Sequence, residues 1–185
     1  MNTAYARKKQ PEIVRRALLD CAARLIADQG LASLTVQAVA AAGGVTKGGL
    51  FHHFPTKQVL VEAVFRDLLD RFDQEIDATL ARDGTAYGCF TRAYIAMAFA
   101  EQNHDLSNPW SALSVSMITD PTLAHLWRDW LSDRLARHQA TDGGPMLEIL
   151  RFAADGVWMA LIHKTSQPDA VDFPALRTHL LSLTR

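Results

Sequence analysis

Cysteine is scarce in this chain, and no stretch of it is apolar for long enough to cross a membrane. Its two cysteines, Cys21 and Cys89, are too few for a disulfide framework. No apolar run reaches the roughly 18 residues that a transmembrane helix requires. No apolar segment directly follows the basic residues near the N-terminus, as a signal peptide would need. We therefore expect a cytoplasmic protein, in a reducing compartment and without a membrane partner.

Glycine, proline and strand-like alternation are also uncommon, whereas apolar residues are plentiful. The 185 residues include 10 glycines and 7 prolines, and 49% are hydrophobic. Segments with the helical spacing of apolar residues follow one another along the chain, so the predicted fold class is all-α, with about nine helices.

The charge is close to balance overall but unevenly distributed. The formal net charge is −1. Residues 1–60 contain eight Lys or Arg and three acids, a balance of +5, and the remainder contains eleven and seventeen, a balance of −6. A basic head on an acidic body predicts one surface for nucleic acid and another that avoids it.

The stretch 34–57 reads as two short helices joined by a glycine turn. Gly43 and Gly44 are expected to end the first helix, and Thr46 to cap the second. Leu50, Phe51 and Phe54 are then its inward anchors. This pattern predicts a helix-turn-helix at 34–53 that reads double-stranded DNA. A helix hairpin with a glycine bend is the alternative, but it gives no reason for a glycine pair that weakens a helix by about 1 kcal/mol per residue.

The same stretch resembles the TetR family of transcriptional repressors. The resemblance is carried by an ungapped run from Gly43 to Lys57, with Val45-Thr46-Lys47-Gly48 at its centre. Gly49 stands where the family has a hydroxyl or small residue, and Phe51 where it has tyrosine, so a contact is lost at each. The predicted DNA contacts, with Lys47 at a base edge or phosphate, are Thr35, Gln37, Thr46, Lys47, Gly48, Gly49, Phe51, His52, His53 and Lys57. The basic residues Arg7 to Lys9 lie on a polar arm, residues 1–9, that could reach phosphates.

Further helices are expected at 11–29, 57–81, 85–102, 110–118, 121–139, 146–165 and 174–184. Pro11 suits the first turn of the helix 11–29. This layout resembles the family architecture of three head helices and six body helices. We therefore predict a DNA-binding domain at 1–56 and a ligand-binding and dimerisation domain at 57–185.

The resemblance implies a ligand pocket in the body and a homodimer through residues 146–184. Helix 146–165 is apolar on more than one face, which fits a core helix, a partner contact or both. Aromatic and methionine side chains at helical spacing commonly form a core, yet they also suit an apolar or aromatic effector, with Asp155 favouring a cationic one. The candidate ligand-binding residues are Phe90, Tyr94, Met97, Trp110, Leu113, Met117, Trp127, Trp130, Phe152, Asp155 and Met159.

Neither catalysis nor a metal or cofactor is predicted. The chain has no nucleophile elbow, phosphate loop or zinc motif, and adjacent His52 and His53 would point about 100° apart on a helix. Asp155 and His163 could face a cavity together. Three functions compete: a homodimeric repressor released by a small molecule, a constitutive DNA-binding protein, and a helical ligand carrier or enzyme that no longer binds DNA.

Overall fold

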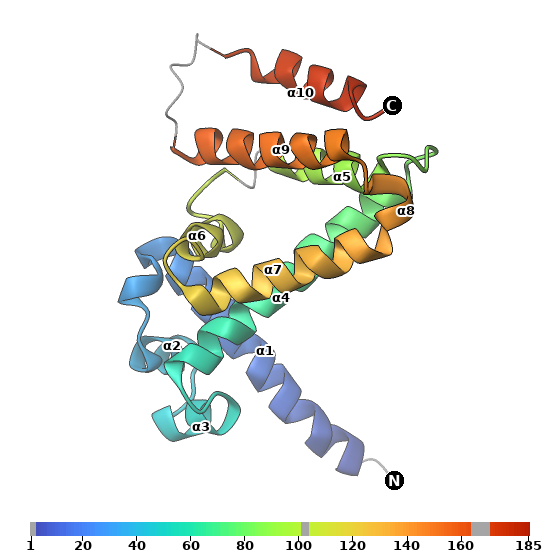
Figure 1. Ribbon diagram of the computed structural model, residues 1–185. Helices are drawn as coiled ribbons and strands as arrows, with labels where there is room; N and C mark the ends of the chain where they lie inside the picture. The colour runs from blue at the N-terminus through green and yellow to red at the C-terminus, as the bar shows by residue number, and fades with distance from the viewer. Residues whose placement is uncertain (1–2, 101–103, 164–170) are drawn as a thin grey trace.

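The fold was analysed in a computed structural model. It describes the backbone of residues 3–100, 104–163 and 171–185, and the side chains of residues 11–100, 104–162 and 171–185. This part of the chain is all helical and contains no strand, which confirms the predicted fold class (Figure 1). The elements are α1 (Thr3–Gln29), η1 (Leu31–Ser33), α2 (Val36–Ala42), α3 (Lys47–His53), α4 (Lys57–Leu80), α5 (Cys89–Ala98), α6 (Pro109–Ser116), α7 (Pro121–Arg137), α8 (Gln139–Asp142), α9 (Pro145–His163) and α10 (Phe173–Ser182).

Three threonines begin the helices of the head and its exit. The Thr35 hydroxyl accepts a hydrogen bond from the Ala38 N–H at 3.1 Å and so caps α2. Thr46 does the same for α3, and Thr56 for α4, at 3.0 and 3.1 Å. Each cap satisfies a backbone donor that the first helical turn leaves free. The predicted Thr46 and Thr56 caps are therefore confirmed.

The turn between α2 and α3 depends on both glycines for different reasons. Gly44 has φ of +67°, in the left-handed region that costs other residues energy. Gly43 has ordinary helical geometry, but a Cβ there would lie 2.6 Å from Leu18 Cδ2. A larger residue at that position would require the Leu18 side chain to move. After the turn, Leu50 of α3 and its C-cap residue Phe54 are almost fully buried.

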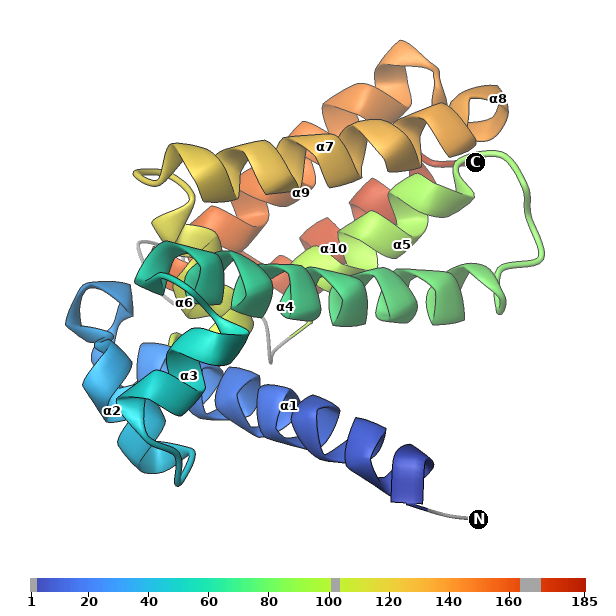
Figure 2. The ribbon, with the colours of Figure 1, turned by 90° about the horizontal axis from the view of Figure 1, so that it is seen from below.

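Helix α4 joins the head to the body. It begins next to α3 and continues for 24 residues, which is about 36 Å of helix. It contacts α1 in the head and α5, α6 and α7 in the body (Figures 1 and 2). Its buried face runs from Leu60 to Ile76.

The body is built on α4, with α7 lying along it and α5 packed against α9. Helix α10 contacts α5 near the C-terminus of the chain. Helix α6 contacts α4 and also reaches the head, where it touches α1 and η1. The body therefore meets the head through α6 as well as through α4.

Two predictions about element boundaries were wrong. Helix α1 begins at Thr3, so residues 3–9 are helical rather than a free arm, and Pro11 lies inside the helix. The segment before Pro11 is rich in Ala, Arg, Lys and Gln, which favour helix. The short helix α8 was not predicted, so the described residues form ten α-helices rather than nine. His138, with φ of −103° and ψ of 15°, separates it from α7.

Candidate functional site: a nucleic-acid interface and a cavity in the body

The predicted DNA contacts lie on α2, α3 and the first turn of α4. Those with exposed side chains or backbone are Thr35, Gln37, Thr46, Lys47, Gly48, His52 and Lys57. Those that are partly buried are Gly49, Phe51 and His53. The buried Leu50 and Phe54 face the head core, so these residues occupy the solvent side of α3. The side chains of Arg7, Lys8 and Lys9 lie outside the described residues.

Local contacts fix how this surface can meet phosphates or bases. The ammonium group of Lys47 lies 5.7 Å from the centroid of the Phe51 ring, so the ring supports the lysine. Phe51 is thus not a fully buried anchor, in contrast to Leu50 and Phe54. The Thr35 and Thr46 hydroxyl oxygens accept backbone hydrogen bonds, which leaves each O–H free to donate to a phosphate.

Four charged side chains bridge α1 of the head to α4. Arg16 donates to both Asp20 and Asp67, and Arg71 lies 2.9 Å from Asp67 and 3.2 Å from Asp20. The hydrogen bond to Asp20 is the main cause that raises the pKa of Arg16. These side chains are partly exposed, so each pair contributes little to stability.

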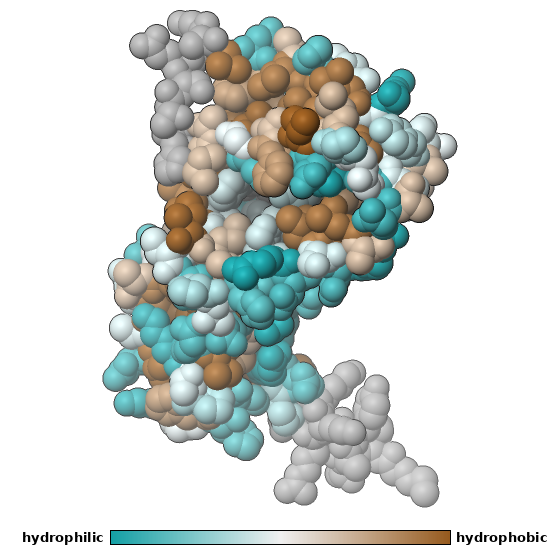
Figure 3. Space-filling view, viewed as in Figure 1, coloured by the Kyte–Doolittle hydropathy of each residue, from teal (hydrophilic) through white to brown (hydrophobic). Residues whose placement is uncertain are grey.

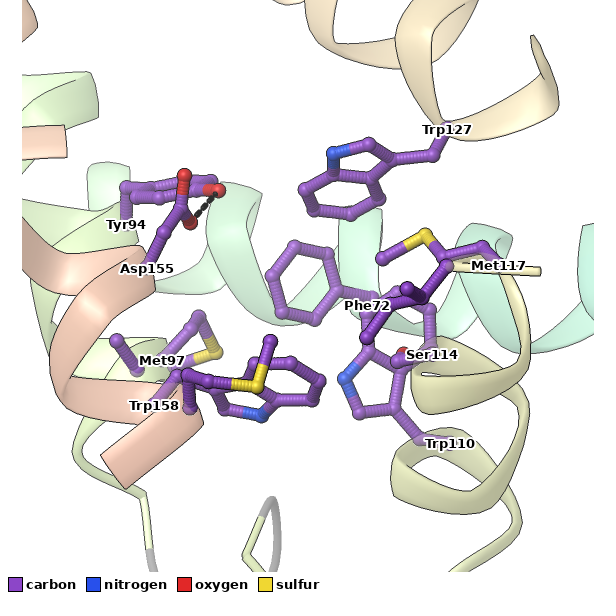
Figure 4. A pocket seen from close by; sticks show the side chains of 12 residues that line it. Phe72, Tyr94, Met97, Trp110, Ser114, Met117, Trp127, Asp155 and Trp158 are labelled. Atoms are coloured by element: carbon purple, nitrogen blue, oxygen red, sulfur yellow. Dashed lines mark hydrogen bonds between the residues drawn. The ribbon is translucent and has the colours of Figure 1, made fainter. Parts of the chain in front are cut away.

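A cavity of about 200 Å³ lies in the body among α4, α5, α6, α7 and α9 (Figure 4). Seven of the residues predicted for ligand binding line it: Tyr94, Met97, Trp110, Met117, Trp127, Asp155 and Met159. Five other lining residues were not predicted: Phe72, Ala98, Ser114, Ile118 and Trp158. Phe72 and Trp158 carried a usable signal, because each is a large aromatic residue on a helix expected to border the body.

Four predicted residues do not line the cavity. Phe90 is fully buried and stacks on His138 with ring centroids 5.2 Å apart, and Leu113 is fully buried in the core. Trp130 packs against Phe72 from outside and donates its indole N–H to Asp73. Phe152 is 68% exposed on α9. Helical periodicity cannot separate these residues from true lining residues, because it does not give the rotation of each helix relative to its neighbours.

Aromatic rings make up much of the cavity wall. Phe72 stacks on Trp110 with centroids 4.6 Å apart and planes inclined by 11°. Trp127 lies 6.0 Å from both rings at steeper angles. Met97, Met117 and Met159 supply flexible thioethers that can adapt to the shape of a ligand.

The polar groups of the cavity are few. The Tyr94 hydroxyl donates to Asp155 Oδ1 at 2.5 Å. Asp155 as a whole is exposed, yet its carboxyl is partly desolvated, which raises the pKa of that group. Burial, followed by the charge of Asp155, raises the pKa of Tyr94 well above its usual range. The side chain of His163, which was expected to face a cavity with Asp155, lies outside the described residues.

A second polar cluster lies at the start of α5, where Cys89, His138 and Asp142 each place one potential metal ligand within 4.8 Å of the others. These three positions do not have the spacing of a metal-binding motif, so this grouping could not be predicted from the sequence. Asp142 already accepts hydrogen bonds from the Thr91 N–H at 2.8 Å and the Thr91 hydroxyl at 2.7 Å. Desolvation, and then the charge of Asp142, raises the pKa of Cys89. Capping of α5 therefore accounts for the buried carboxylate of Asp142.

No helix among the described residues is both long and apolar enough to span a membrane. Two family descriptions match the chain: "Bacterial regulatory proteins, tetR family" over residues 18–64, and "Tetracyclin repressor-like, C-terminal domain" over residues 88–185.

Several curated relatives carry the name HTH-type transcriptional repressor KstR2. That of Mycobacterium tuberculosis is 32% identical over 161 residues, covering 80% of this chain and 79% of the relative. That of Mycolicibacterium smegmatis is 37% identical over 92 residues, covering 48% of this chain and 45% of the relative. The second alignment therefore spans less than half of that protein.

Several solved structures share the fold. The multidrug binding protein EbrR complexed with malachite green has a TM-score of 0.70 at 20% identity, covering 92% of this chain and 98% of that one. A putative transcriptional regulator from Saccharomonospora viridis in complex with choline has a TM-score of 0.69 at 18% identity, covering 92% and 95%.

Proposed function

Because this chain belongs to the TetR family and is a DNA-binding transcriptional regulator, we propose that it is a homodimeric repressor released from a palindromic operator by a small molecule. The observation that carries the proposal is the pairing of two features in one chain. The head exposes Lys47 and His52 on a short capped helix, and the body contains a cavity lined largely by aromatic rings. We assign DNA binding to residues 1–56 and ligand binding with dimerisation to residues 57–185.

In this proposal α3 enters the major groove, which is wide enough for a helix. Lys47 contacts a base edge or a nearby phosphate, and Gly48 and Gly49 allow the helix to approach the backbone closely. Lys57 and the hydroxyls of Thr35 and Thr46 position the phosphates. Gln37, Phe51, His52 and His53 complete the contact surface.

DNA binding is tested by its salt dependence and by matched lysine variants. If the dimer neutralises about eight phosphates, log K falls with log salt with a slope near −7. Lys57→Ala should weaken all sequences alike, whereas Lys47→Ala should also relax base preference. Arg128→Ala, which removes an exposed cation from α7, is the control. A binding constant indifferent to salt, or an equal effect of Arg128→Ala, would contradict the assignment.

An exposed apolar stripe on α9 supports a homodimer through residues 146–184. Met146, Ile149 and Phe152 are 49%, 59% and 68% exposed, and their spacing of three residues places them near one another on the helix. Figure 3 shows apolar side chains gathered over the body and fewer over the head. Two recognition helices of a two-fold dimer would enter successive major grooves, roughly 34–36 Å apart.

Release of DNA is proposed to follow from a change in the spacing of the two heads. A ligand that presses on Trp110 or Met117 acts on α6, which contacts α1 and η1 of the head directly. A ligand that presses on Phe72 acts on α4, which carries the head at its N-terminal end. The solved structures with malachite green and with choline support a small-molecule effector in this fold.

The coupling is tested by reciprocal titration. A hundredfold drop in operator affinity corresponds to about 2.7 kcal/mol, and operator DNA must weaken effector binding by the same factor. Effector binding is followed by tryptophan fluorescence with and without operator. Equal effector affinity in both titrations would favour the constitutive DNA-binding protein, and effector binding without any specific duplex binding would favour the ligand carrier.

A further inference from the structure

The hydroxyl of Ser114 is an unpartnered polar group in the wall of the cavity. Ser114 is 1% exposed, and its side chain lines the cavity from α6. Among the described residues, the Ser111 and Ser114 hydroxyls are the buried side-chain polar atoms without a hydrogen-bond partner. A buried hydroxyl without a hydrogen-bond partner destabilises a folded protein. A ligand group that hydrogen-bonds to the Ser114 hydroxyl would therefore supply its missing partner.

The opposite wall carries groups of different chemistry. Figure 4 shows Tyr94 and Asp155 on one side of the cavity, and Ser114 with Trp110 and Met117 on the other. The Asp155 carboxylate accepts from Tyr94 through one oxygen, which leaves its other oxygen able to face a cation. The faces of aromatic rings near this carboxylate attract the same charge. The two walls thus present an end that carries the Asp155 carboxylate and aromatic rings, with the Arg151 charge acting on it from nearby, and a neutral hydrogen-bonding end.

We infer that the effector is a compact organic cation that carries a hydroxyl or carbonyl oxygen at the end remote from its charge. Its cationic group lies against Asp155 and the aromatic rings, and its oxygen hydrogen-bonds to Ser114. This inference rests on the proposed function, because it concerns the ligand of the same cavity.

The volume of the cavity sets the size of the group that fits inside it. A cavity of about 150 Å³ accepts benzene, and this cavity measures about 200 Å³. One ring, or an aliphatic group of similar size, fills most of it without rearrangement. The three lining methionines allow modest expansion for a substituent at each end.

The test uses five probes of three kinds, and the kinds differ in one group at a time. The 3- and 4-hydroxyphenyl-trimethylammonium ions carry both groups, phenyltrimethylammonium lacks the hydroxyl, and 3- and 4-tert-butylphenol lack the charge. Binding to the full chain without DNA is followed by tryptophan fluorescence and calorimetry. In the unmodified protein, the better isomer with both groups should bind about tenfold more tightly than either partial probe.

Single substitutions assign each gain to its residue. Ser114→Ala should abolish the gain from the hydroxyl and leave phenyltrimethylammonium binding unchanged. Asp155→Asn should abolish the gain from the charge and leave tert-butylphenol binding unchanged. Ser111→Ala is the matched control, because Ser111 is also on α6, fully buried and unpartnered, but does not line the cavity. It should preserve both gains.

The outcomes separate this inference from the proposed function. The inference is overturned if the hydroxyl gives no gain, if Ser111→Ala removes the gain as Ser114→Ala does, or if none of the probes binds. Operator binding is measured on the same samples. Intact, salt-dependent operator binding alongside any of these failures would leave the regulator standing and remove only this effector class.

Discussion

Arg134 of α7 donates its Nε–H to Asp73 Oδ1 of α4 at 2.5 Å, across 61 residues of sequence. The arginine is 2% exposed, and its Nη1 also donates to Asp77 at 2.6 Å. The indole N–H of Trp130 donates to the same oxygen of Asp73. Asp73 and Asp77 of α4 therefore bind two residues of α7, Trp130 and Arg134, and α7 is the helix that supplies Trp127 to the cavity.

Replacing Arg134 by methionine should destabilise the protein. Removing one member of a buried ion pair costs about 3–5 kcal/mol, and the partial exposure of Asp73 and Asp77 places the expected loss at or below the lower end of that range. Urea unfolding measures it. Arg137→Met, at an exposed position on the same helix, is the control and should change the free energy of unfolding little. Equal effects of the two variants would show that the pairing contributes nothing.

The same pairing predicts an acid-sensitive contribution to stability. Hydrogen bonding to Arg134 lowers the pKa of Asp77 below its usual range. The contribution is therefore fully present above the unfolded pKa and is lost as pH falls through the lower folded pKa. The stability of Arg134→Met should depend less on pH in this acid window. Parallel acid-unfolding curves for variant and parent would rule the linkage out.

Gly44→Ala should destabilise the head by about 1–2 kcal/mol, because an L side chain is strained at φ of +67°. No atom lies within 4 Å of the added Cβ, so the loss reports backbone strain alone. Gly44→Asn should recover part of it, since asparagine tolerates this region. Gly84→Ala, in open space and without a positive φ, is the control. Thermal unfolding measures the stability of each variant. An unchanged melting temperature for Gly44→Ala would contradict the expectation.

Phe152→Glu should dissociate the proposed dimer without unfolding the monomer, because the side chain is 68% exposed on α9. The sedimentation coefficient at micromolar concentration and the affinity for the operator should both fall. Ile13→Glu makes a similar change at a 62% exposed site on α1 and should leave the dimer intact. A charge at Leu180 is no substitute, since Leu180 is 6% exposed and belongs to the core of the protomer. A dimer that survives Phe152→Glu and Ile149→Glu would place the interface elsewhere.

Asp155→Asn should stabilise the protein or leave it unchanged at neutral pH. Desolvation raises the folded-state pKa of Asp155 above its ordinary value. The folded state then holds this proton more tightly, and stability falls as pH rises from the unfolded pKa through the folded one. The variant should lack that fall, as melting temperatures across the window would show. A variant that is less stable than the parent at every pH would mean that the carboxylate has a structural role.

Helix caps could be predicted from the sequence, whereas the rotation of each helix relative to its neighbours could not. Thr46 and Thr56 cap helices through bonds to residues three positions along, so their role follows from neighbours in the chain. Tyr94 lines the cavity while Phe90, one helical turn earlier, stacks on His138. Only the packing of α5 against its neighbours distinguishes the two. The same reason explains why Ser114, a small residue on a helix of mixed composition, gave no signal.

The low reactivity expected of the two cysteines makes site-directed labelling of the protein in solution practicable. Cys21 is 5% exposed in the head, and burial and the charge of Asp142 keep the Cys89 thiol protonated to higher pH. Thiol-directed labels react with the thiolate, so both native positions should react slowly at neutral pH. A cysteine introduced at the exposed Ala41 of α2 can then carry a spin or fluorescent label without removing either native residue. In a dimer, the distance between the two labels reports the spacing of the two heads.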